Sequence, residues 1–236
     1  MVNLKVTELD ANTTPIGTDI LPIVDDPGGS PANQKITLAN LGIIDGWIPA
    51  SESWSYASAT TITVPSGAAS KYRVGDKIKL TQTTTKYFSI IGVADTVLTV
   101  TGGTDFTVAT PTAITDNYYS HAESPLGFPG WFNYSPSITW GGTPPTGGTM
   151  IAKFVVTCKT LTVHIHIINM TAGLTNNTAN IPLPFTITTQ YLMAYGQISV
   201  AEVVNPASTY VDNTTIYVSG VAVAATRLKV LAILPI

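Results

Sequence analysis

Charge is scarce in this chain, since Asp, Glu, Lys and Arg make up only 11% of its 236 residues. An average soluble domain carries about a quarter of such residues. A surface with so little charge is poorly protected against association, so we expect the chain to bury part of it in an oligomer. The net charge of −3 and the pI of about 5.5 provide no basic footprint for nucleic acid. Nucleic acid is therefore not an expected partner.

Cysteine is nearly absent, because Cys158 is the only one. This excludes a disulfide within the chain and a metal site built from several thiolates. Cys158 follows the stretch FVVT at 154–157, which alternates like a strand. The pattern predicts a buried and unreactive thiol.

Histidine is equally rare, with three in the chain. His164 and His166 alternate on one predicted strand and therefore face the same side of a sheet. They can be ordinary residues on a polar sheet face, a weak surface zinc site or, if three chains meet on an axis, a shared metal site. Two ligands at strand spacing are a weak signal, so we expect no metal and no cofactor.

Long hydrophobic runs are missing, and so are most helix formers. The apolar runs are far too short to cross a membrane as a helix, and the N-terminus lacks the basic segment and apolar core of a secretory signal. We therefore expect assembly in a cytoplasm and no membrane insertion. Thr, which favours strands, and Gly, Pro and Asn, which mark turns, replace Glu, Lys and Gln. This composition predicts an all-β protein.

Catalytic motifs are absent as well. The sequence has no Gly-x-Ser-x-Gly, Walker, His-Glu-x-x-His or Rossmann pattern. A glycosidase needs two carboxylates placed across the scissile bond, and nothing in the linear order pairs Glu123 or Glu202 with a second acid. We expect no catalytic residues and no enzyme, with a polysaccharide depolymerase as the alternative.

The first 45 residues contain a predicted hairpin. Short apolar runs at 20–24 and 34–37 flank the turn cluster DDPGGSP at 25–31, which indicates a loop longer than two residues. Two strands cannot bury their own apolar side chains. We therefore expect this segment to rest on a larger partner.

The order L…DILPIVD…KIT…L in the same segment resembles the virion-attachment segment of bacteriophage tail-fibre, baseplate and head-fibre proteins. The resemblance implies that residues 1–45 anchor the chain to other virion structural proteins of the tail, baseplate or capsid. The residues expected to make this contact are Leu9, Asp19, Leu21, Pro22, Ile23, Val24, Ile36, Leu38 and Leu41.

Residues 46–134 are expected to form a small β-barrel-like module. Four segments alternate with the period of half-buried strands and are separated by turn signals, at 60–64, 77–81, 86–91 and 97–100. The second of them is expected to point its isoleucine and leucine inward and Lys77 and Lys79 outward. Trp47, in the linker at 42–50 that overlaps the start of this range, is expected to be exposed.

This module also resembles a small β domain of phage tail and tail-fibre proteins. The likeness rests on WSY at 54–56, YRVGDKIKLTQ at 72–82, KYF at 86–88, LTVTGG at 98–103 and SPLGFP at 124–129.

Residues 135–236 are expected to form a distal jelly-roll-like β-sandwich. Its predicted strands lie at 150–157, 160–168, 187–193, 197–204, 215–218 and 227–234. The long polar connection at 169–184 contains TAGLTNN at 171–177 and leads into PLPF at 182–185, which resembles the head domains that end many phage fibre and spike proteins. Loops and sheet faces of such sandwiches are the usual binding surfaces.

Aromatic residues gather in the Pro- and Gly-rich stretch from 125 to 145. Their rings can pack between the two modules, or their flat faces and polar tips can bind sugar rings. Packing is the preferred interpretation, because large aromatics dominate cores and interfaces. Under the second interpretation, the glycan contacts are Trp131, Tyr134 and Trp140.

These patterns together predict a structural protein of the phage virion, namely a tail-fibre or receptor-binding protein. It is expected to be anchored by its N-terminal segment and to form a homotrimer, since closed symmetry is usual among oligomers. The distal sandwich is expected to adhere to a host-surface glycan or protein. The alternative is a capsid decoration or head-fibre protein with a mainly mechanical role.

Overall fold

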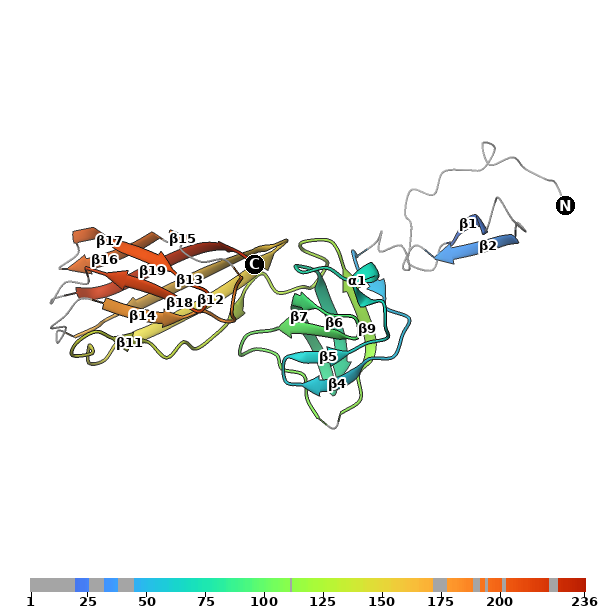
Figure 1. The fold of residues 1–236 in the computed structure, drawn as a ribbon, viewed down its shortest axis with the longest axis horizontal. Coiled ribbons are helices and arrows are strands. Elements are labelled where there is room, and N and C mark those ends of the chain that lie inside the picture. The colour runs from blue at the N-terminus through green and yellow to red at the C-terminus, as the bar shows by residue number, and fades with distance from the viewer. Residues whose placement is uncertain are drawn as a thin grey trace.

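The computed structural model describes residues 20–25, 32–37, 45–110, 112–171, 178–188, 192–193, 195–200, 203–220 and 225–236. Almost all regular elements in these ranges are antiparallel strands. They form a hairpin, a curled seven-stranded sheet and a ten-stranded sheet, which follow one another along the long axis of the molecule (Figure 1). The all-β class expected from composition is confirmed.

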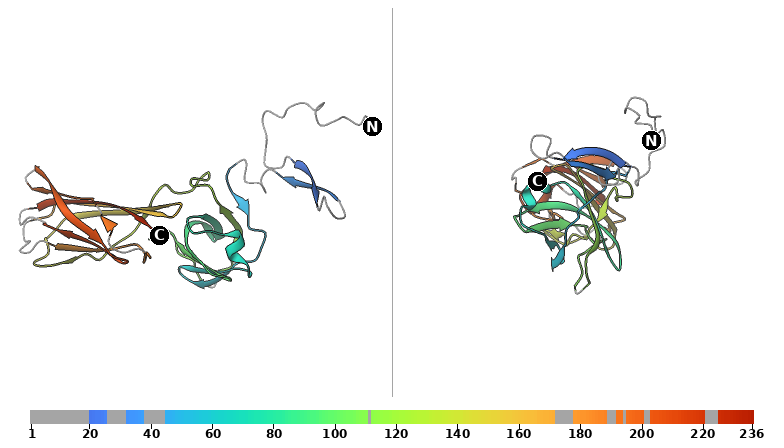
Figure 2. Two further views of the ribbon diagram at one scale, coloured as in Figure 1. Left: turned by 45° about the horizontal axis from the view of Figure 1, so that its top comes forward. Right: turned by 90° about the vertical axis from the view of Figure 1, so that its right-hand side faces the viewer.

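The N-terminal hairpin pairs β1 (Ile20–Asp25) with β2 (Ala32–Thr37), with Ile20 opposite Thr37 and Asp25 opposite Ala32. This agrees with the predicted hairpin and its long connection. Figures 1 and 2 draw the hairpin apart from the two larger sheets. Of the expected anchoring residues, Leu21, Pro22, Ile23, Val24 and Ile36 belong to its strands. Leu9, Asp19, Leu38 and Leu41 lie outside the described residues.

The seven-stranded sheet curls into a half-barrel with the strand order β3-β9-β6-β7-β8-β5-β4. Its elements are β3 (Ile48–Pro49), β4 (Ser55–Ser58), β5 (Thr61–Thr63), helix α1 (Ala68–Lys71), β6 (Lys77–Gln82), β7 (Thr84–Val93), β8 (Val97–Thr101) and β9 (Thr115–Ser120). Ile62, Ile78, Leu80, Ile90 and Leu98 are fully buried inside it. The four predicted strands are present, whereas helix α1 and strands β3, β4 and β9 were not foreseen.

Two expectations about this half-barrel are wrong. Trp47 is buried, because its indole Nε1 donates a hydrogen bond to the carbonyl oxygen of Leu126 at 2.8 Å and its ring packs against Phe128. Lys77 is only 1% exposed, because the first residue of β6 lies beneath the neighbouring sandwich. The alternation that points Ile78 and Leu80 inward is confirmed.

The ten-stranded sheet folds into a two-layered sandwich. One layer runs β10-β12-β13-β19-β16, and the other contains β18, β14, β11 and β15. The strands are β10 (Phe132–Asn133), β11 (Thr139–Trp140), β12 (Thr149–Thr157), β13 (Thr160–Ile168), β14 (Thr178–Pro182), β15 (Leu192–Met193), β16 (Tyr195–Val200), β17 (Val203–Val211), β18 (Thr215–Ser219) and β19 (Ala225–Pro235). Strand β17 joins the layers, because its first half pairs with β16 and its second half with β18.

The sandwich core lies between the two layers. It takes Val163 and Leu234 from the first layer and Ile181 and Val218 from the second. The predicted strands 150–157, 160–168, 215–218 and 227–234 match observed ones closely. Of the predicted strand 187–193, the structure describes a strand at Leu192–Met193, while residues 189–191 lie outside the described ranges. The segment 197–204 belongs to two strands instead of one. The polar connection at 169–184 contains an additional strand, β14.

The half-barrel and the sandwich meet in a junction without a long linker. A ring cluster fills it, in which Phe132 of β10 contacts Phe106, Phe128 and Phe154 with centroid distances of 6.2, 5.6 and 5.6 Å. The backbones also touch, because Thr104 N donates to the carbonyl oxygen of Asn133 at 2.8 Å. The connector role predicted for the aromatic stretch is thus met by Phe128 and Phe132.

Candidate functional site

The outward side chains of β10, β12, β13, β19 and β16 form rows across the first layer of the sandwich, because antiparallel register places them opposite one another. We call this surface the outer face. Its central row consists of Asn133, Lys153, His164, Leu231 and Tyr195. The next row consists of Ile151, His166, Lys229 and Gln197.

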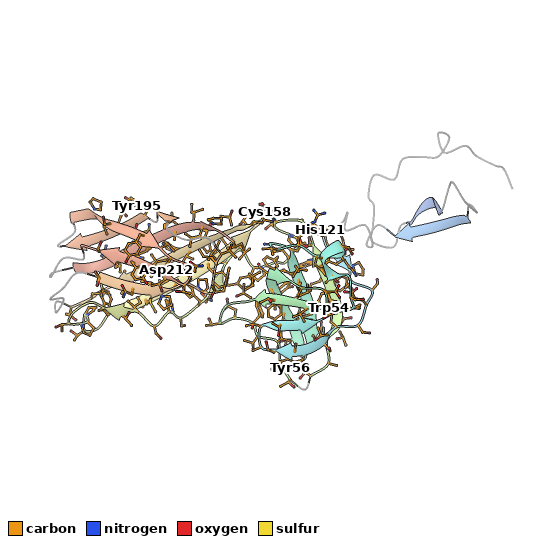
Figure 3. All side chains as sticks on the ribbon, viewed as in Figure 1. Trp54, Tyr56, His121, Cys158, Tyr195 and Asp212 are labelled. Atoms are coloured by element: carbon orange, nitrogen blue, oxygen red, sulfur yellow. The ribbon has the colours of Figure 1, made fainter. Side chains whose placement is uncertain are left out.

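The outer face mixes bases with exposed apolar side chains. Tyr195 is 58% exposed and Ile233 is 60% exposed, with Ile151 and Leu231 also open to solvent. The inward residues of the same strands, such as Val163 and Val230, are fully buried. Figure 3 shows Tyr195 toward the end of the sandwich that is remote from the half-barrel. The face therefore offers a broad, amphipathic surface to a ligand.

His164 and His166 lie near the middle of the outer face, on the same side of β13 as predicted. Their ring centroids are 6.5 Å apart. Burial lowers the pKa of His164 below its ordinary value, and the nearby Lys229, His166 and Lys153 lower it further. The pair is thus surrounded by positive charge, which disfavours a metal cation. Within the described ranges, no three or more His, Cys, Asp or Glu side chains cluster as metal ligands would.

Trp131 lies at the edge of the outer face, next to β10. It is 43% exposed and lines a cavity of about 270 Å³ together with Glu123, Phe128, Val155 and other residues. A flat indole beside a carboxylate and main-chain polar groups is an arrangement that can hold a sugar ring. Of the three aromatic residues considered for glycan contact, Trp131 is the one that presents an open ring here.

Tyr134 and Trp140 are placed differently. Tyr134 is buried against Phe154, and the pKa of its phenol is raised by this burial. Trp140 in β11 is half-buried and packs on the sandwich core. Both belong to the packing of the sandwich.

A second cavity, of about 510 Å³, opens at the junction between the two modules. The side chains of Asp76, His121, Glu123 and Cys158 line it, together with Arg73 and Lys159. His121 Nδ1 lies 3.0 Å from Asp76 Oδ1, and the Cys158 thiol donates to Glu123 Oε1 at 2.8 Å. Figure 3 shows His121 and Cys158 on the two sides of the junction.

The prediction of a buried Cys158 is wrong. The residue is exposed in the turn between β12 and β13, with a positive φ of 50°. Its hydrogen bond to Glu123 raises the pKa of the thiol, as does the negative charge of that carboxylate. A thiol with a raised pKa is a poor nucleophile at neutral pH, so this geometry does not favour covalent chemistry.

Lys77 is buried at the junction between the half-barrel and the sandwich. Its ammonium donates hydrogen bonds to the carbonyl oxygens of Gly75, at 2.9 Å, and of Val156 in the sandwich. Burial lowers the pKa of Lys77 to about 8, although Cys158, Glu123 and Asp76 oppose this shift. Because Gly75 belongs to the half-barrel and Val156 to strand β12 of the sandwich, Lys77 links the two modules.

The carboxylates weighed for catalysis do not form a pair in the described part of the chain. Glu123 is engaged with Cys158 at the junction. Glu202 lies outside the described residues.

One group on the opposite layer was missed from the sequence. Tyr210 of β17 stacks on Tyr217 of β18 with ring centroids 4.4 Å apart and an angle of 7° between the planes. The Tyr217 hydroxyl donates to Asp212 Oδ2 at 2.9 Å. The two tyrosines are seven residues apart, and only the hairpin register brings them together. The alternating TIYVS stretch was the available signal.

The described residues contain no helix long and apolar enough to span a membrane. Comparison with known proteins found no match to a family model, to a curated protein or to a solved structure.

Proposed function

We propose that this protein is a structural component of a phage virion, anchored through its N-terminal segment and adhering to the host surface through its sandwich. The observation that carries the proposal is the arrangement along one axis. A small hairpin lies apart at one end, and a sandwich with a broad amphipathic face lies at the other (Figure 1). A hairpin of two strands is marginal on its own, which is consistent with a segment that gains its stability from a partner.

The ligand proposed for the sandwich is a host-surface glycan. Trp131 provides an exposed ring at the edge of the outer face, and the adjoining cavity reaches Glu123 and Ser124. Such a surface binds weakly as a single copy. Several copies on one particle multiply a modest affinity through avidity, so adhesion does not require a deep pocket.

The proposed assembly is a homotrimer. The low charge content supports it, because a sparsely charged surface favours association. Sedimentation of the purified chain tests this directly, with an expected mass of three times 24.9 kDa. A monomer at micromolar concentration would contradict this part of the proposal.

The decisive experiment compares the full chain with a variant that lacks residues 1–41. We expect the shortened chain to remain folded and oligomeric but to be absent from particles assembled with it. Loss of folding would show that the segment belongs to the core of the protein and would contradict the anchor.

Labelling the protein on intact particles separates the two candidate locations. Label at the tail supports adhesion. Label spread over the head, with no effect of the protein on adsorption to cells, would favour the second candidate, a capsid decoration protein with a mechanical role.

A further inference from the structure

The sandwich has the opposite charge balance to the rest of the chain. From residue 132 onward its only acids are Glu202 and Asp212, whereas its bases are Lys153, Lys159, Arg227 and Lys229. Asp212 lies in the turn between β17 and β18, in the other layer. The acidic character of the whole chain therefore arises from the preceding residues.

The bases of the sandwich gather on the outer face. Lys153, Lys229 and Arg227 point outward from β12 and β19, and His164 and His166 point outward from β13 between them. No Asp or Glu stands at an outward position of β12, β13, β19 or β16 in the described ranges. The nearest carboxylates lie at the β10 edge of the face, where Asp105 accepts a hydrogen bond from Asn133 at 2.8 Å and Glu123 shares the cavity beside Trp131. Toward β13 and β19, the bases have no acid among the outward residues of their own strands.

Register brings these bases close together. Lys153 is directly opposite His164, and His166 is directly opposite Lys229. Directly opposite side chains on one sheet face are about 5 Å apart at Cβ, where like charges destabilise each other. Once the histidine of such a pair carries a proton, an anion bound between it and the lysine offsets this repulsion, so the face gains free energy from an anionic ligand.

We propose that the outer face binds an anionic polysaccharide, whose sulfate or carboxylate groups contact Lys153, Lys229 and the two histidines. Sugar rings would lie against Trp131 at one edge and Tyr195 at the other. The central row crosses five strands, or about 19 Å at the usual strand spacing, which accommodates several linked sugars. This inference rests on the proposed adhesive function and names the chemical class of its ligand.

Other occupants fit the face less well. A second copy related by a two-fold axis would present the same patch, so the bases of one copy would meet those of the other. Nucleic acid requires an extended basic footprint, whereas this chain has a net charge of −3. Both occupants are outcomes that the experiment can detect.

The test measures binding of the full-length chain to dextran sulfate and to neutral dextran of the same length by calorimetry. We expect binding to dextran sulfate alone. Lys153→Gln and Lys229→Gln should each weaken it about threefold and together about tenfold, the loss of one or two surface charge contacts. Lys159→Gln removes the same charge from the exposed β12–β13 turn and should change the affinity less than twofold.

Three results of the binding measurements would overturn the inference. These are equal binding of neutral dextran, equal weakening by Lys159→Gln, and binding of single-stranded poly-dT as tight as that of dextran sulfate. The last would indicate a general polyanion surface. A concentration-dependent dimer that dextran sulfate does not disrupt would assign the face to a second copy.

The pH dependence provides an independent test, because dextran sulfate stays charged while His164, whose pKa is lowered by burial and by nearby bases, gains a proton as the pH falls. The groups facing the two histidines are Lys153 from β12 and Lys229, Leu231 and Arg227 from β19, with Tyr195 and Gln197 beyond on β16. Binding should tighten as the pH falls from 7.5 to 5.5. His164→Asn/His166→Asn should remove this change while leaving the chain folded; an unchanged pH dependence would contradict the proposal.

Failure of this inference is distinguishable from failure of the proposed function. If dextran sulfate binds the outer face but the protein is absent from particles, the virion role fails and the anionic ligand stands. If the protein is on particles and mediates adsorption, yet binds neutral glycans equally well, the virion role stands and the anionic ligand fails.

Discussion

The ammonium group of Lys77, in the half-barrel, donates a hydrogen bond to the carbonyl oxygen of Val156, in the sandwich. The two residues are 79 positions apart, and the side chain of Lys77 is removed from solvent. A buried cation is tolerated only when it is hydrogen-bonded. The pair therefore couples the two modules through a strand position that alternation alone assigns to solvent.

Lys77 should give the protein a pH-dependent stability. Its pKa is lowered to about 8 in the folded state, so between pH 8 and 10.5 the unfolded chain binds more protons than the folded chain. The free energy of unfolding contributed by this residue therefore rises with pH in that window and is lowest below pH 8. The gain is up to ~3 kcal/mol, from the size of the pKa difference.

The measurement compares urea unfolding of the wild type and Lys77→Met at pH 7.5, 9 and 10. We expect the free energy of unfolding of the wild type, relative to that of Lys77→Met, to rise from pH 7.5 to pH 10. Lys159→Met, in an exposed turn, is the control and should show no such change. A parallel pH profile for Lys77→Met and the wild type would contradict the assignment.

Gly75→Ala should destabilise the junction. Gly75 has a φ of +99°, and an added Cβ would lie 1.9 Å from the carbonyl oxygen of Cys158. Alanine at positive φ alone costs more than ~1 kcal/mol, and the clash adds to it. We expect a clearly lowered melting temperature by calorimetry.

Two glycines provide matched controls for that change. Gly130→Ala meets no atom within 4 Å and should be nearly neutral, whereas Gly220→Ala has a φ of +82° in open space and should show the backbone cost alone. If Gly75→Ala were no worse than Gly220→Ala, the close approach to Cys158 would not matter for stability.

Trp131→Ala should reduce adhesion without a large loss of stability. Its ring is 43% exposed, so we expect a change in unfolding free energy of about 1 kcal/mol or less. Trp47→Ala, at a buried site, should instead cost ~3–5 kcal/mol. Adsorption assays alongside thermal melts separate the effects, and a strong destabilisation by Trp131→Ala with normal adhesion would assign this ring to packing.

Glu123→Gln should make Cys158 more reactive. Glu123 raises the pKa of the thiol through its hydrogen bond and its charge. At a given pH, Cys158 is therefore less often a thiolate than it would be without the Glu123 carboxylate. Removing the charge should accelerate alkylation by iodoacetamide at pH 8 roughly severalfold, because the thiolate is the reacting species. Asp116→Asn, an exposed acid of the half-barrel, should leave the rate unchanged.

Local patterns account for much of the fold. The segment 160–168 was predicted with its observed bounds, because every second residue is apolar and the turn at 158–159 interrupts the pattern. Strand β14 was missed, because TANIP contains only two side chains that become buried, Ala179 and Ile181. Its pairing with β18, which no local signal encodes, makes it a strand.

The candidate site depends more on pairing across distant strands. Trp131 and Tyr134 are three positions apart in the same aromatic stretch, yet one is exposed and the other buried. Pairing of Phe132 with Phe154 turns Phe132 inward, so Trp131 faces out. Cys158 was wrongly predicted to be buried, because the turn that exposes it contains no Gly or Pro that would indicate a turn in the sequence.

Gly75 and Gly103 bring main chain against main chain at two separate places, beside the carbonyl oxygens of Cys158 and Asn133. With two such contacts, the modules can rotate relative to each other only about the line that joins the contacts. The packed rings of Phe106, Phe128 and Phe132 oppose that rotation. A force applied at the end of the sandwich remote from the junction would therefore be transmitted to the half-barrel with little bending between them. Bending at the junction would require the closely packed peptide groups at Gly75 and Gly103 to separate from those of Cys158 and Asn133.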